Sequence, residues 1–258
     1  MSLTPRKRSG FSQGLYAISA TQKERLGTVR ELDDGRTFVY CLNGAVDLVA
    51  GVNCASVITS GANEQTVTVA HAVGTELVTF TNGTGSTIAA DDYKDGKLVV
   101  TAGSGIGECY DILGNTSAIN GATMQIRLAT GLVTAWSTST TDVTIYKNKY
   151  NGVVVNPTDG QQLPVCVTQR PVTAAYYFWG QVLGDGAMLI DNAGAASGAE
   201  LDEKVINPSL SHAGYGYIAA SPDATDVLVG YRHVLGYIID EADVTDDEAV
   251  LVNIRIGL

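Results

Sequence analysis

Four consecutive aromatic residues, from Tyr176 to Trp179, open the stretch that most constrains how this chain can fold. Aromatic and β-branched residues favour a pleated, half-buried surface, so residues 174–183 are predicted to form a core strand. Alternate side chains of a strand point to opposite faces, which places Tyr177 and Trp179 together and Phe178 on the other side. Neither face is polar, and we therefore expect both to be covered by other parts of the protein.

A hairpin is predicted closer to the N-terminus. The pair Asp34-Gly35 is typical of a tight turn. It lies between an extended segment at 26–32 and a returning strand at 37–42, and residues 46–51 continue the strand pattern.

Between residues 56 and 150, polar and apolar residues alternate with the period of a strand. Val67 and Val69, for example, are both predicted to point inward. Further strands are predicted at 76–81, 97–101, 124–128, 142–146 and 250–256. Strands at such short intervals indicate an all-β protein with sandwich or barrel-like β-domains, in which only 88–93 and 197–205 are expected to hold a helical turn.

Three parts of the chain are distinguished by their patterns. Residues 1–26 show no core-forming periodicity and are predicted to form an extended N-terminal arm. A β-domain is predicted at 27–155 and a C-terminal β-domain at 156–258. Pro and Gly interrupt the strand pattern at 154–173, which is where we place the boundary between an inserted β-domain and the C-terminal part.

Charge is unevenly spread along the chain, whose formal net charge is -11. Residues 1–36 hold seven basic side chains against four acidic ones, net +3, and the remainder holds nine against twenty-three, net -14. An acidic body argues against a nucleic-acid-binding surface. The basic arm could bind an acidic partner surface or be a solvated terminus.

Several compartments and cofactors are disfavoured by the sequence. No apolar run of eighteen residues is present, and no apolar segment follows the basic N-terminus, so neither a membrane span nor a signal peptide is predicted. The four cysteines have no metal-binding spacing and are expected to be free, buried thiols of a protein assembled in a reducing cytoplasm. Cys41 and Cys54 are the one pair close enough in sequence to suggest a disulfide.

Candidate catalytic motifs are weak. The glycine-rich loop at 103–107 follows a strand but precedes another strand rather than the helix that a phosphate-binding loop needs. Residues 10–14 read Gly-x-Ser-x-Gly, yet the basic arm precedes them instead of the core strand of a nucleophile elbow. His71, His212 and His233 show no metal-ligand spacing.

Acidic clusters leave more alternatives open. Asp91, Asp92 and Asp95 partly resemble a calcium loop, but Tyr93 occupies the middle ligand position. The run from Asp240 to Glu248 could be a solvated loop, a surface for a basic partner, or a divalent-ion site at a subunit contact. No acidic pair stands out as the catalytic pair of a glycosidase.

Two groups of motifs resemble the virion structural proteins of tailed bacteriophages that are encoded near the major capsid protein. The first group is Leu26-Gly27-Thr28-Val29, Asp34-Gly35-Arg36-Thr37-Phe38-Val39-Tyr40, Asn43-Gly44 and Gly51. The second is Tyr177-Phe178-Trp179-Gly180-Gln181-Val182-Leu183-Gly184, a Gly-rich link, Asn207-Pro208-Ser209 and Val234-Leu235-Gly236-Tyr237. The resemblance covers about half of the chain and leaves 56–150 out.

The resemblance implies a capsid decoration, or cement, protein that is not an enzyme. Such a protein would bind the major capsid protein on the outer surface of the virion, after assembly in the host cytoplasm, and would need no cofactor, nucleic acid or membrane. The candidate capsid contacts are the basic residues of the arm: Arg6, Lys7, Arg8, Lys23 and Arg25.

Two other classes of function stay open. A tail or fibre component that binds a host-surface carbohydrate would need exposed aromatic residues over a polar groove, and Trp136 is the candidate for such a residue. A β-sandwich enzyme that cleaves glycans is the third class.

Two structural expectations complete the sequence-based picture. Trp179 is expected to be a core residue without a ligand role. A homotrimer is expected to form through residues 205–258, because segments 227–231 and 250–256 are both apolar and residues 205–239 hold few charges. The number three follows from the resemblance and from the three-fold sites of icosahedral shells.

Overall fold

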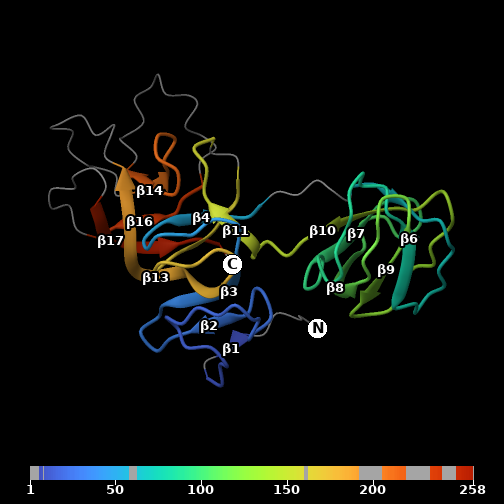
Figure 1. The fold of residues 1–258 in the computed structure, drawn as a ribbon, viewed down its shortest axis with the longest axis horizontal. Helices are drawn as coiled ribbons and strands as arrows, with labels where there is room; N and C mark the ends of the chain where they lie inside the picture. The colour runs from blue at the N-terminus through green and yellow to red at the C-terminus, as the bar shows by residue number, and fades with distance from the viewer. Residues whose placement is uncertain are drawn as a thin grey trace. The chain divides into compact units, whose positions relative to one another are not determined.

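The computed structural model describes residues 6–7, 9–57, 63–159, 162–191, 205–218, 233–239 and 248–257. These residues form strands, turns and loops without a helix, which confirms the all-β fold. The chain divides into two compact units, each shown in Figure 1. Unit 1 consists of Met1–Val57 and Lys149–Leu258, and unit 2 of Ile58–Asn148.

This division differs from the predicted domains at 27–155 and 156–258. Strand β4 (Asn53–Ala55) pairs antiparallel with β11 (Asn151–Val155), so the chain leaves unit 1 after β4 and returns to it at β11. Unit 2 is therefore an insertion between two paired strands. The Pro- and Gly-rich interruption at 154–173 lies inside unit 1, and local patterns gave no sign of the long-range pairing that sets the true boundary.

Unit 1 contains one sheet whose strands come from both ends of the chain. Besides β4 and β11, its strands are β1 (Arg6–Lys7), β2 (Val29–Glu31), β3 (Thr37–Asn43), β12 (Pro164–Val167), β13 (Tyr177–Asp191), β14 (Val205–Pro208), β15 (Gly216–Ile218), β16 (Gly236–Ile238) and β17 (Glu248–Arg255). The predicted hairpin is present as β2 and β3, with Val29 opposite Val39.

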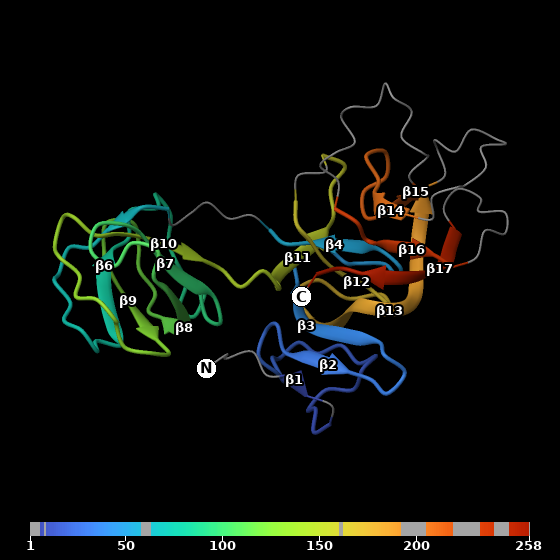
Figure 2. The same cartoon turned by 180° about the vertical axis from the view of Figure 1, so that it is seen from behind.

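Strand β13 organises unit 1, because its two halves belong to two different closed circuits of strands. Its first half pairs with β3 and β12, closing the circuit β3-β11-β4-β12-β13. Its second half pairs with β17 and β15, closing the circuit β13-β15-β14-β16-β17. Both views show this long strand beside β3 at one end and beside β17 at the other (Figures 1 and 2). The ladder with β3 shifts register between Gln181 and Leu183, where the first circuit gives way to the second.

Both faces of the aromatic stretch are covered, as the sequence predicted. Phe178 belongs to the large core that fills unit 1. Trp179 lies on the opposite face in a second cluster with Leu26, Phe38 and Tyr40, and only 3% of its surface is exposed. Trp179 is thus a core residue.

The predicted N-terminal arm is not extended over residues 9–26. Phe11 and Leu15 pack against the cluster around Trp179, and the side chain of Gln13 is buried there. These residues cover the outer face of β3 and β13. The lack of periodicity was misleading, because a covering segment needs only a few apolar anchors.

Unit 2 is a barrel-like sheet with its own core. Its strands are β5 (Gln65–Thr66), β6 (Leu77–Thr81), β7 (Lys97–Ala102), β8 (Cys109–Asn115), β9 (Thr123–Leu128) and β10 (Asp142–Tyr146), in the sheet order β5-β10-β7-β8-β9-β6. The two end strands, β5 and β6, also contact each other. Interior side chains such as Phe80, Ile112 and Trp136 fill the barrel.

Three local predictions fail. Val69 points outward rather than inward, because β5 ends at Thr66 and the alternation stops there. Residues 88–93 form an isolated bridge at Ile88 and turns instead of a helical turn. Residues 46–51 contribute only an isolated bridge at Leu48. The apolar segment at 227–231 lies outside the described residues. The predicted helical turn at 197–205 also lies outside them, except for its last residue.

Candidate functional site

The five basic residues predicted as capsid contacts occupy different settings. Arg6 and Lys7 form β1, which pairs in parallel with β2. Lys23 is exposed and Arg25 half-buried on the covering segment, and the backbone amide of Lys23 donates to the Tyr40 hydroxyl. Arg8 lies outside the described residues.

Trp136, the aromatic residue considered for carbohydrate binding, is buried. Only 2% of its surface is exposed, and its ring makes edge contacts with His71 and Tyr110 inside unit 2. It cannot stack on a ligand at the surface, so this prediction is wrong. Its backbone pairs with that of His71, which places it within the barrel of unit 2.

A polar groove lies in unit 1 at the tip of the β2–β3 hairpin, and we call it the hairpin groove. Its volume is about 540 Å³, within the range of small-molecule sites. The groove is lined by residues of the hairpin turn, of β13 and of β17: Asp34, Gly35, Arg36, Leu183, Gly184, Asp185, Asn253 and Arg255.

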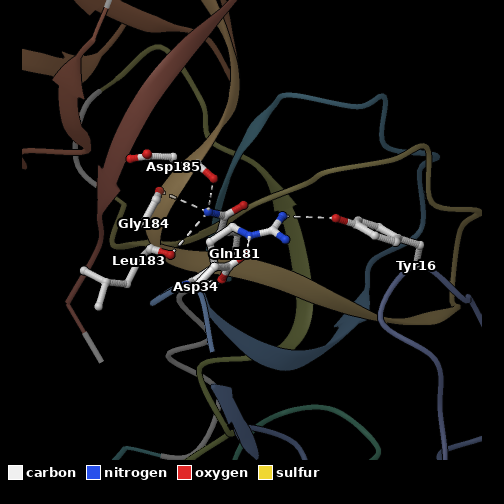
Figure 3. Close-up of polar contacts among 7 residues, drawn as sticks. Tyr16, Asp34, Gln181, Leu183, Gly184 and Asp185 are labelled. Carbon is white, nitrogen blue, oxygen red and sulfur yellow. Dashed lines mark hydrogen bonds and ion pairs between the residues drawn. The ribbon is translucent and has the colours of Figure 1, made fainter. Parts of the chain in front are cut away.

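The floor of the groove depends on a glycine and a buried amide. Gly184 has a φ of +88°, and a Cβ atom there would lie 3.0 Å from the Cα of Arg36. The Nε2 group of Gln181 faces the main-chain oxygens of Leu183, Gly184 and Asp185 at 3.2, 3.0 and 3.0 Å (Figure 3). These contacts hold the backbone of β13 where its ladder with β3 shifts register.

One wall of the groove is fixed by an ion pair at the hairpin turn. The Nε of Arg36 donates to Asp34 Oδ2 at 2.7 Å, and its Nη1 donates to the Tyr16 hydroxyl at 3.2 Å. Hydrogen bonds to Tyr16 and Asp34 raise the pKa of Arg36. The backbone amide of Arg36, followed by its side chain, lowers the pKa of Asp34. Both groups are therefore charged at neutral pH.

The opposite wall is a row of cross-strand neighbours. Asp185 on β13 lies opposite Asn253 on β17, which in turn lies opposite Tyr237 on β16. Asn253 donates to Asp185 at 2.8 Å and accepts from the Nε of Arg255 at 2.9 Å. The Arg255 guanidinium lies 5.2 Å from the centre of the Tyr237 ring. The side chains of this wall are thus held in place before any ligand arrives.

The other motifs from the sequence do not assemble into a site. In the described part of the chain, no group of three or more His, Cys, Asp or Glu residues could hold a metal ion. The glycine-rich loop at 103–107 joins β7 to β8. Ser12 of the Gly-x-Ser-x-Gly string lies in the covering segment, where its backbone donates to Glu24. In the acidic loop, Asp92 pairs with Lys147 at 2.7 Å. The acidic run falls outside the described residues up to position 247.

The cysteines are all free thiols, as expected, but Cys109 is exposed instead of buried. Cys41 and Cys54 form no disulfide, and the Sγ of Cys41 lies 3.8 Å from that of Cys166. Burial raises the pKa of the Cys41 thiol. A protonated thiol in an apolar core is a poor nucleophile.

A buried carboxylate is a feature that the sequence reasoning missed. Asp191, at the end of β13, accepts a hydrogen bond from the Ser209 hydroxyl and lies 3.1 Å from the Nδ1 of His212. The Ser209 oxygen also accepts the backbone amides of Ser211 and His212. The Asp191 carboxylate thus bridges the serine and the histidine and holds the turn at residues 209–212 closed.

Unit 2 carries exposed aliphatic residues on linked loops at one end of the barrel, which we call the apolar loop end. Val73, Ile106 and Val133 are 64%, 69% and 74% exposed. Backbone hydrogen bonds join Gly74 and Thr75 to Leu132, next to Val73 and Val133. Glu108 accepts from the Thr134 and Tyr110 hydroxyls, and so ties the loop of Val133 to the hairpin of Ile106.

Among the described residues, no helix is long and apolar enough to cross a membrane. Comparisons with protein-family models, with curated proteins and with solved structures found no match to this chain.

Proposed function

We propose that this protein is a structural component of a tailed-phage virion that decorates the capsid, binds the major capsid protein and stabilises the shell. It would act on the outer capsid surface after assembly in the host cytoplasm, without catalysis. The motif resemblance motivates the proposal. The apolar loop end of unit 2 is the structural observation that supports it best.

Exposed apolar groups that gather on one surface are typical of interaction sites, whereas scattered ones are ordinary. Val73 and Val133 flank backbone-paired residues, so their side chains lie on neighbouring loops. Contact with a capsid protein would remove them from water. The basic residues Arg6, Lys7, Arg8, Lys23 and Arg25 stay proposed as a second, electrostatic contact.

The contact can be tested with a matched pair of variants. Val73→Asp combined with Val133→Asp should weaken binding to shells of the major capsid protein. Ile119→Asp is the control, because Ile119 is 66% exposed on a different loop of the same unit. Equal binding by the double variant and the control would contradict this contact.

The copy number in virions tests the function itself. A decoration protein should be present in particles on the order of hundreds of copies, because its attachment site repeats over the symmetric shell, and a tail or fibre component in far fewer. Quantitative gel analysis of purified particles distinguishes the two.

We further propose that the protein assembles as a homotrimer through residues 205–258. Leu251 and Ile239 support this, because both are exposed and joined by a backbone hydrogen bond. Sedimentation equilibrium should show a trimer of the 27.0 kDa chain. A single monomeric species at about micromolar concentration would contradict a pre-formed trimer.

A further inference from the structure

We propose that the hairpin groove is a binding site for a neutral saccharide. The proposal rests on the groove alone and does not depend on capsid decoration. Its first support is charge balance: the lining contains two arginines and two aspartates, Arg36 with Asp34 on one wall and Arg255 with Asp185 on the other. A site for phosphate or nucleic acid would carry excess positive charge. An uncharged ligand is repelled by neither the arginines nor the aspartates of the groove.

The hydrogen-bonding groups of the groove match a polyol. Each sugar hydroxyl donates one hydrogen bond and accepts others, so it needs donors and acceptors side by side. Within the described residues, Arg255 uses only its Nε in a hydrogen bond, which leaves both Nη groups as donors. In the described part of the chain, Asp185 accepts a side-chain hydrogen bond through Oδ1 and none through Oδ2, which leaves Oδ2 as an acceptor.

One tyrosine beside the groove adds apolar surface. Tyr237 lies opposite the lining residue Asn253, contacts the Arg255 guanidinium and is exposed. A sugar ring presents hydroxyls at its edge and C–H groups on its face, and an aromatic ring suits the latter. Tyr237 is thus an exposed ring next to polar groups, whereas Trp136 is buried in unit 2.

The site is also preorganised. Asp34, Arg36, Asn253 and Arg255 are each held by side-chain partners, and Gly184 allows the hairpin turn to approach β13 closely. Fixed groups lose little conformational freedom on binding, which favours affinity. An open groove of this size should bind a monosaccharide with a Kd of about 1 to 10 mM.

The full-length protein should be titrated with glucose, galactose, mannose, rhamnose, N-acetylglucosamine and lactose, followed by saturation-transfer and side-chain amide NMR. At least one sugar should bind and shift the Nε–H signal of Arg255. Arg255→Ala and Asp185→Asn should each weaken binding about tenfold or more, because each removes charged hydrogen-bonding capacity. Arg170→Ala, a charge-matched surface variant whose side chain bonds to Pro171 alone among the described residues, should bind as the wild type does.

Three results would overturn the proposal. The first is that none of the six sugars binds at a sugar concentration about tenfold above the expected Kd. The second is that a sugar binds with unchanged affinity to both groove variants, which places its site elsewhere. The third is that malonate shifts the Arg255 signal and no sugar does, which makes the groove an anion site. Circular dichroism of each variant checks that the fold is retained.

Discussion

Gln13 connects the covering segment to the aromatic cluster, and its replacement is the sharpest test of that packing. Its side chain is only 4% exposed. The Nε2 group donates to the main-chain oxygens of Ala17 and Tyr177 at 2.7 and 3.1 Å. The Oε1 atom accepts from the Tyr40 hydroxyl at 2.7 Å. Gln13→Ala removes all three hydrogen bonds.

The loss of stability in Gln13→Ala depends on which hydrogen bonds the partners of Gln13 retain. A hydrogen bond contributes about 1 kcal/mol, and a buried group left without any partner costs about 1 to 3 kcal/mol. Here the Tyr177 oxygen still accepts from Ser19, and the Tyr40 hydroxyl still accepts from Lys23. The penalty for unpaired groups is therefore mainly that of the Tyr40 hydroxyl proton, which loses its acceptor. We expect the free energy of unfolding of unit 1 to fall by about 3 kcal/mol.

The main-chain oxygen of Gln13 is unaffected by this substitution. It accepts from Trp179 Nε1 at 3.3 Å and from Arg30 Nη1 at 3.2 Å. Both bonds persist in the alanine variant, so the decrease in the free energy of unfolding reports on the side chain of Gln13 alone.

The two tryptophans allow each unit to be followed separately. Trp179 lies in unit 1 and Trp136 in unit 2, so a Trp136→Phe background leaves one reporter on unit 1. With a urea m-value of about 2 kcal/mol per M, Gln13→Ala should lower the midpoint by about 1.5 M. The control is Gln22→Ala, which removes one bond to Glu24 at an exposed site and should cost less than about 0.5 kcal/mol. If Gln13→Ala costs no more than this control, the covering segment does not stabilise unit 1.

Three further outcomes are expected. Trp179→Ala should destabilise unit 1 by about 3 to 5 kcal/mol in the same urea assay, and an unchanged midpoint would contradict its burial. Residues 58–148, expressed alone, should fold and melt cooperatively by circular dichroism, because unit 2 has its own core; a disordered fragment would show that it needs unit 1. Burial raises the pKa of Tyr40 from 10.0 to about 12, so the stability it contributes is complete below pH 10 and is lost as the pH rises toward 12. The Tyr40→Phe variant should therefore lose less stability than the wild type at alkaline pH. If the free energy of unfolding of the two proteins depends on pH in the same way, the loss does not come from Tyr40.

Local patterns predicted much of the fold because strands and hairpins have local signatures. Asp34-Gly35 correctly marked the β2–β3 hairpin, and the alternation of Tyr177, Phe178 and Trp179 correctly gave two covered faces. The domain division failed because it depends on the pairing of β4 with β11, about a hundred residues apart. The covering segment was missed because its buried groups are spaced irregularly.

The groove could not be predicted, since its walls come from three distant parts of the chain. Asp34, Asp185 and Asn253 have no common local motif, and their convergence follows only from the pairing of β13 with both β3 and β17. Trp136 illustrates the reverse error. It was the candidate for an exposed aromatic residue, whereas the barrel places its ring inside.

The motif Trp179-x-Gln181-x-x-Gly184 now has a structural reason. Strand β13 must leave one circuit and enter another, and the register shift after Gln181 makes that transition. The Gln181 amide binds the carbonyls that the shift displaces, Gly186 leaves room for its side chain, and Gly184 adopts the positive φ that the bend requires. The same bend brings the hairpin turn against β13 and so creates the concave surface of the groove. A motif that resembled a family signature in the sequence therefore encodes the junction of two strand circuits, and the candidate binding site is a geometric consequence of that junction.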